Sequence, residues 1–155
     1  MEDSRMPSTL AARLADALRH QQAYLAIYRH YRDARPREDF AALLAVLCDD
    51  AQEASEGLAR ALRHAGESPL AVEPPPRLLE QGLRRRGTLS RLQFILVGMQ
   101  NNIAYYQAQL AYPDEDDVRG LWAELLATAQ QRLTQIKGLI RALEHRAAQE
   151  ERPTQ

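Results

Sequence analysis

Apolar residues recur at intervals of three and four along most of the chain, the spacing that places them on one face of an α-helix. The first such stripe consists of Leu10, Leu14, Leu18, Leu25 and Tyr28. It predicts a helix capped by Ser8 or Thr9, whose hydroxyls can accept from the first backbone amides. The helix should end near Ala34, because the residue before Pro36 disfavours the helical conformation.

The same spacing predicts three further long helices. A second helix should run from about Arg37 to Ala65, with Gly66 as its left-handed cap. A third is expected over residues 88–112 and should stop at Pro113. The fourth should begin in the acidic run at residues 114–117, because carboxylates stabilise the positive end of a helix dipole. We expect residues 147–155 to form a frayed tail.

The lengths of the connections predict a single domain with a defined topology. Short connections join the first helix to the second and the third to the fourth, so residues 9–66 and 88–146 should each form an antiparallel hairpin. The crossover at residues 67–87 contains Pro69 and three consecutive prolines at 74–76, which exclude helix from its first part. Residues 78–86 could form a short surface helix within it.

The second hairpin repeats the first at a fixed offset. Residues 57–64 and residues 138–145, which lie 81 positions further on, are identical at six of eight positions. At the same offset Tyr24 matches Tyr105, and Asp33 matches Asp114. A repeat of this length predicts two duplicated helical hairpins.

In its helix lengths, duplication and long crossover, residues 9–146 resemble the ferritin-like superfamily, and its rubrerythrin-type bundles in particular. The resemblance implies an all-α four-helix bundle. In that family, inward Glu residues and Glu-x-x-His motifs hold two iron or manganese ions. No Glu-x-x-His occurs in this chain, and amides, Gln21 and Asn102, stand where carboxylates would be expected on the first and third helices. Asp50 and Glu53 on the second helix correspond to Gln131 and Thr134 on the fourth.

These differences lead to three functional hypotheses. The favoured one is a metal-free structural or protein-interaction module, without catalysis, in which Gln21, Asn102, Asp50 and Gln131 form a hydrogen-bonded polar layer. The first alternative is an oxidase or storage protein with an atypical iron or manganese site built from Asp50, Glu53 and His20, with Glu56 as a further candidate. The second alternative is a small-molecule binder with its pocket at the polar layer.

The tyrosines indicate a homodimer surface. All six lie on the first and third predicted helices, and tyrosine is enriched at interface cores. The interface candidates are Tyr24, Tyr31, Tyr105 and Tyr112.

The amino-acid composition of the chain narrows the range of macromolecules and membranes that it is expected to bind. The net charge of −1 argues against nucleic acid and anionic membranes, although residues 84–86 form a short arginine patch. No apolar run approaches the ~18 residues that a membrane helix requires. Cys48 is the single cysteine and should be buried. With no disulfide and no apolar leader, the chain is expected in the cytoplasm. Because Lys137 is the only lysine in an arginine-rich chain, we expect a bacterial source.

Overall fold

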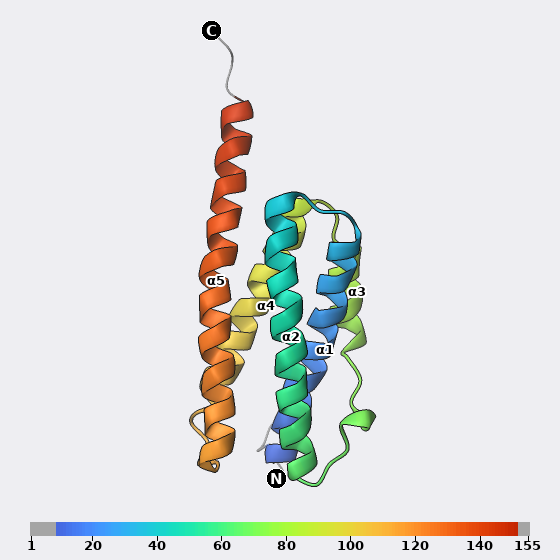
Figure 1. Ribbon diagram of the computed structural model, residues 1–155, viewed down its shortest axis with the longest axis vertical. Helices are drawn as coiled ribbons and strands as arrows, with labels where there is room; N and C mark the ends of the chain where they lie inside the picture. Colours follow the sequence, from blue (N-terminus) through green and yellow to red (C-terminus); the bar gives the residue numbers. More distant parts are fainter. Residues whose placement is uncertain (1–8, 152–155) are drawn as a thin grey trace, which may run out of the picture.

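The computed structural model describes residues 9–151 and is all-α, with no strand in that part of the chain (Figure 1). Four long helices carry the fold, and the crossover between the second and third of them contains a 3₁₀ turn and a short helix. The elements are α1 (Leu10–Asp33), α2 (Glu38–His64), η1 (Pro69–Ala71), α3 (Pro76–Arg84), α4 (Thr88–Gln109) and α5 (Asp116–Glu150).

The helix ends follow the chemistry expected from the sequence. Thr9 caps α1, because its hydroxyl accepts from the amide of Ala12 at 3.1 Å, whereas Ser8 lies outside the described residues. Gly66, with φ of 92°, ends α2, and the next amide, of Glu67, donates back to the Leu62 carbonyl at 3.1 Å. This pattern is a Schellman cap.

Several boundaries differ from the prediction: α4 ends at Gln109 rather than at residue 112, and α3 ends at Arg84 rather than at residue 86. The crossover helix begins at Pro76 rather than Leu78, because proline is tolerated at the first helical position, where its missing amide has no helical partner. Helix α5 continues to Glu150, past the expected start of a tail at residue 147, and its exposed C-terminal turns extend beyond the other helices (Figure 1). Residues 152–155 of that tail lie outside the described residues.

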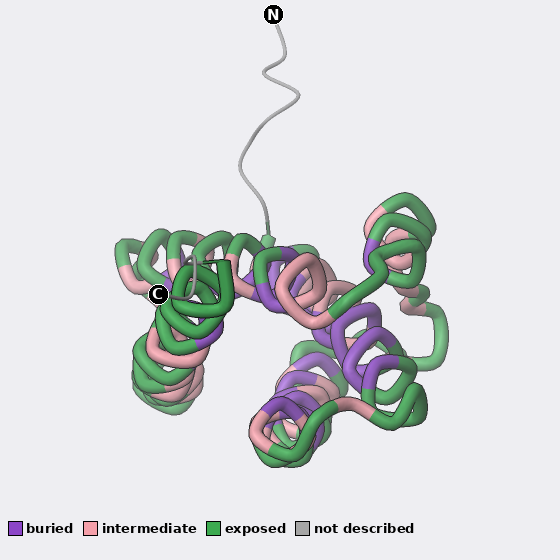
Figure 2. Tube along the Cα trace, turned by 90° about the horizontal axis from the view of Figure 1, so that it is seen from above, coloured by how far each residue is buried: buried purple, intermediate pink, exposed green. Residues whose placement is uncertain are grey.

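The helices pack as two hairpins, α1 against α2 and α4 against α5, and the hairpins meet where α5 lies against α2 (Figure 1). Helix α3 lies along α1. Viewed from above, the buried positions gather on the faces that the helices turn toward one another (Figure 2). Cys48 and Trp122 both belong to this core, and burial raises the pKa of the Cys48 thiol. No helix in residues 9–151 combines the length and apolar character needed to cross a membrane.

The tyrosines form no exposed face, contrary to the expectation from the sequence. Tyr24 and Tyr31 are 3% and 0% exposed, and Tyr105 and Tyr112 are half-buried. Tyrosine can be buried where its hydroxyl finds a partner. The Tyr31 hydroxyl donates to the Gly82 carbonyl at 2.6 Å, and the Tyr105 hydroxyl donates to the Arg13 carbonyl at 2.7 Å. Tyr24 and Tyr31 therefore cannot contribute to an exposed dimer surface, and the homodimer itself stays a prediction.

The crossover is fixed to one end of the bundle. The side chains of Ile27 and Phe94 pack so closely on Gly82 that a Cβ there would lie 2.4 Å from an Ile27 carbon. The guanidinium of Arg91 lies 4.8 Å from the centre of the Tyr31 ring, and its Nε donates to the Arg85 carbonyl at 3.0 Å. The short helix α3 is thereby held against α1.

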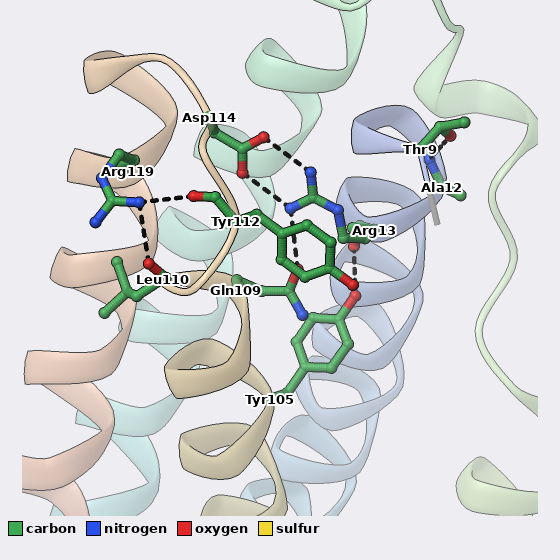
Figure 3. Close-up of polar contacts among 9 residues, drawn as sticks. All are labelled: Thr9, Ala12, Arg13, Tyr105, Gln109, Leu110, Tyr112, Asp114 and Arg119. Atoms are coloured by element: carbon green, nitrogen blue, oxygen red, sulfur yellow. Dashed lines mark hydrogen bonds and ion pairs between the residues drawn. The ribbon is translucent and has the colours of Figure 1, made fainter. Parts of the chain in front are cut away.

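Arg13 joins α1 to the α4–α5 connection at the other end of the bundle (Figure 3). Its guanidinium donates to both carboxylate oxygens of Asp114, at 2.8 and 2.9 Å, and to Oε1 of Gln109 at 3.1 Å. It also lies 3.9 Å from the centre of the Tyr112 ring. The two charged side chains are only 6% and 10% exposed. We call Arg13, Gln109, Tyr112 and Asp114 the arginine clamp.

The arginine clamp should make the free energy of unfolding depend on pH in the acidic range. Hydrogen bonds from Arg13 are the main cause that holds the pKa of Asp114 below its ordinary value. A lowered folded pKa stabilises the protein above the unfolded value of about 4, and this contribution is lost as the pH falls through the folded pKa. We expect the stability advantage of the wild type over Asp114→Asn to be constant near neutrality and to shrink below a pH of about 4. Urea denaturation at several pH values measures it, and an advantage unchanged in strong acid would contradict the prediction.

Candidate functional site: a polar-lined cavity

A cavity of about 300 Å³ lies among α1, α2, α4 and α5. This volume is at the lower end of the range for small-molecule pockets. Its wall is part polar and part apolar, with Leu47, Ala51, Met99, Leu125 and Ala129 among the apolar lining residues. All four long helices contribute to the wall, so the cavity exists only because the two hairpins come together.

Gln21 and Asn102, two members of the predicted polar layer, both line this cavity. Each is only 8% exposed, and each comes from a different hairpin. Gln21 is partnered, because its Nε2 donates to the Tyr106 hydroxyl at 2.6 Å. The side chain of Asn102 makes no hydrogen bond to any residue in the described part of the chain.

The Asn102 residue is 92% buried, but its amide atoms keep access to the cavity and are not among the fully buried polar atoms without a partner, which in the described residues are Gln22 Oε1, Ser55 Oγ and Trp122 Nε1. Leaving a fully buried polar group without a partner costs about 1–3 kcal/mol, and most buried polar groups therefore have one. Asn102 also borders a second cavity of about 190 Å³ between α1 and α4, which is lined by Asp16, His20 and Tyr105 as well. The Asn102 amide thus stands between two hollow spaces, where water or a ligand can satisfy it.

Two tyrosines add neutral hydrogen-bonding groups to the cavity wall. Burial raises the pKa of Tyr106 to about 12 and that of Tyr28 well above its ordinary value. Both side chains are therefore uncharged phenols at neutral pH and can donate. The hydroxyl of Tyr106 accepts from Gln21, which leaves its own proton free to donate.

Charged side chains lie at the rim, between α2 and α5. Arg132 of α5 pairs with Asp50 of α2 at 2.5 and 3.3 Å, and both are partly buried. Glu53, Arg60 and Glu124 also line the rim and are exposed. The carboxylate of Asp50 is thus already neutralised by a guanidinium, and hydrogen bonding to Asp50 is the main cause that raises the pKa of Arg132.

The structure corrects the predicted polar layer at Gln131. That side chain is exposed, and the next residue, Arg132, takes the inward position instead. The spacing carried this signal, because Arg132 lies three residues after buried Ala129 and four before buried Ile136. Tyr28 was read as part of the apolar stripe, although it also lines the cavity.

The candidate metal ligands do not come together. His20 borders the second cavity, with Nδ1 2.8 Å from the Asp16 carbonyl, whereas Asp50 and Glu53 lie at the rim of the first. Within residues 9–151, no three His, Cys, Asp or Glu side chains are grouped closely enough to hold a metal ion. Arg132 already supplies the positive charge beside Asp50 that a metal would provide. The donor set therefore does not fit the dinuclear site of the resembled family, and Thr134, its last corresponding position, is exposed.

Comparison with known proteins adds no relative. No protein-family model matches the chain, and neither a curated protein nor a solved structure matches it. The fold and the site thus define the chain as an all-α protein with a polar-lined cavity between its hairpins.

Proposed function

We propose that this protein binds a small organic molecule in the cavity between its two hairpins and does so without catalysis. The observation that carries the proposal is Asn102, a residue that is 92% buried, lines a cavity of about 300 Å³ and makes no hydrogen bond to the described residues. A purely structural polar layer would pair its members, as Gln21 and Tyr106 do. The donor and acceptor groups of the Asn102 side chain can instead bond to a bound molecule.

The two amides should respond differently to removal. Asn102→Leu should change the free energy of unfolding of the free protein by less than about 0.5 kcal/mol, because Asn102 makes no hydrogen bond to the described residues and its amide is accessible to water in the cavity. Gln21→Leu should lower it by about 1 kcal/mol, because it breaks the hydrogen bond to Tyr106. Urea denaturation of both variants measures the contrast. If Asn102→Leu is as destabilising as Gln21→Leu, Asn102 belongs to a structural network and the proposal loses its support.

Binding itself can be tested with a fragment library of varied chemistry, by nuclear magnetic resonance. The Met99 methyl and the Asn102 side-chain amide report from the cavity wall. We expect bound fragments to shift both signals in the wild type but not in Ala129→Leu, which fills the cavity. Ala127→Leu, an equal change at an exposed position of the same helix, should retain binding. A library without any fragment that shifts these signals would overturn the proposal.

We further propose that the bundle is a ferritin-like duplication of one hairpin. Gln21 and Asn102 are related by the 81-residue offset and reach the same cavity from different hairpins. Each hairpin also contacts the other in the same way. Arg13, in the fourth position of α1, covers Tyr112, and Arg91, in the fourth position of α4, covers Tyr31. The 81-residue offset pairs Arg13 with Phe94 rather than with Arg91, so the first feature follows the repeat and the second supports only an approximate twofold relation.

The remaining sequence hypotheses stay predictions. They are a protein-interaction role, a homodimer, a bacterial cytoplasmic setting, and the alternative of an iron or manganese protein. Elemental analysis of protein purified without a chelator tests the metal alternative.

A further inference from the structure

We infer that the ligand of the cavity is an uncharged molecule of about ten non-hydrogen atoms, with an amide-like head that both donates and accepts hydrogen bonds and an otherwise apolar body. This inference rests on the proposed function and names its ligand class.

The polar groups on the inner wall of the cavity are best satisfied by a ligand that has both a hydrogen-bond donor and a hydrogen-bond acceptor. Asn102 offers an NH₂ donor and a carbonyl acceptor, and the carbonyl of Gln21 is a second acceptor. The hydroxyls of Tyr28 and Tyr106 supply donors. A carboxylate could accept from these donors but would face the two amide carbonyls without a proton to give. An ammonium would have the opposite defect.

Among the described residues in the interior of the cavity, no unpaired charged side chain is present to neutralise an ionised ligand. The four buried polar side chains of the lining are Gln21, Tyr28, Asn102 and Tyr106, and these, like the partly buried Thr128, are neutral. Asp50 and Arg132 already neutralise each other at the rim, and Glu53, Arg60 and Glu124 are exposed to water. An ionised ligand could pair with Glu53, Arg60 or Glu124 only where these side chains are exposed, whereas in the interior it would have to break the Asp50–Arg132 pair or remain unpaired, and burying an unpaired charge is costly.

The size of the cavity and its apolar lining residues indicate the size of the ligand and the polarity of its body. A water molecule occupies about 30 Å³ of liquid volume, so the space of about 300 Å³ matches a ligand of about ten non-hydrogen atoms. Apart from the polar groups, the ligand would meet aliphatic carbon and the methionine sulfur, from Leu47, Met99, Leu121 and Leu125. This surface favours an apolar body.

Three probes of one skeleton test the class: benzamide, benzoate and benzylamine, titrated into the full-length protein and followed by the Met99 and Asn102 signals. We expect benzamide to bind at least about tenfold more tightly than benzoate or benzylamine, because only the amide satisfies both donor and acceptor groups. Hexanamide and hexanoate repeat the comparison on an aliphatic skeleton.

Variants of the protein then show where the amide head group of the ligand binds. Asn102→Leu should weaken benzamide binding by at least about tenfold, whereas Gln100→Leu, an amide-to-leucine change at an exposed position of the same helix, should leave it within about twofold. Binding of the aliphatic amide should follow the same pattern. Thermal unfolding of each variant shows that the fold is retained, so a loss of binding can be assigned to the amide.

The possible outcomes separate this inference from the proposed function. Benzoate binding that is stronger than benzamide binding and lost in Arg132→Gln would overturn the inference in favour of an anionic ligand. Benzylamine binding that is lost in Asp50→Asn would do so in favour of a cation. If no probe binds while other library fragments shift the cavity signals, the amide class is wrong and the binding site stands. If neither probes nor library bind, both proposals fail.

Discussion

Replacing Arg13 with methionine should lower the free energy of unfolding by about 3–5 kcal/mol. The change keeps an unbranched side chain but leaves Asp114, whose side chain is 10% exposed, without its charged partner. Gln109 would also lose a hydrogen bond, and Tyr112 would lose the cation above its ring. Urea denaturation at neutral pH gives the free energy difference directly.

A second arginine of α1 provides the matched control. Arg32 is exposed, and its ion pair with Asp33 is long, at 3.9 Å. Exposed pairs of this kind contribute little, so Arg32→Met should change the free energy of unfolding by less than about 0.5 kcal/mol. Similar losses in the two variants would show that the clamp contributes no more than a surface arginine.

Gly98→Ala should lower the free energy of unfolding by about 1–3 kcal/mol, although alanine is normally the better helix former. Gly98 lies within α4, directly against the ring of Tyr24, and an added Cβ would come within 2.6–2.8 Å of three ring and hydroxyl atoms. Tyr24 is stacked on Tyr28 with ring centres 6.0 Å apart, so it cannot move without disturbing the cavity wall. Thermal or urea unfolding measures the loss.

The same substitution should have the opposite sign in α5. A Cβ added at Gly138 meets nothing within 4 Å, so Gly138→Ala should raise the free energy of unfolding by about 0.5–1 kcal/mol through helix propensity alone. A stabilising Gly98→Ala would mean that α1 and α4 are not packed as closely as the structure describes.

Much of the fold could be predicted because its signals are local. Prolines and glycines mark helix ends through their own backbone geometry, and helical spacing placed Gln21 and Asn102 at the cavity. The tyrosines were misassigned because a phenol suits either an interface or a core, and the choice depends on a distant hydroxyl partner. For Tyr31 that partner is a carbonyl in the crossover, at Gly82.

Long-range pairs account for the rest of what the sequence could not show. Asp114 was expected to act only on the dipole of the next helix, whereas its main partner, Arg13, lies 101 positions away. Arg132 and Asp50 are separated by 82 positions. Helical spacing can indicate that a charged residue faces inward, but its partner depends on how two hairpins pack.

The bundle is thus closed differently at its two ends. At one end, Arg13 relies on a carboxylate, whereas at the other, Arg91 and Tyr31 bond to backbone carbonyls of Arg85 and Gly82 in the crossover. Protonation can weaken only the first, and cleavage of the crossover chain can release only the second. The end at which unfolding begins should therefore depend on the condition that destabilises the bundle. In acid, the hairpins would first separate at the Arg13 end. After a proteolytic cut in the crossover, they would first separate at the Tyr31 end.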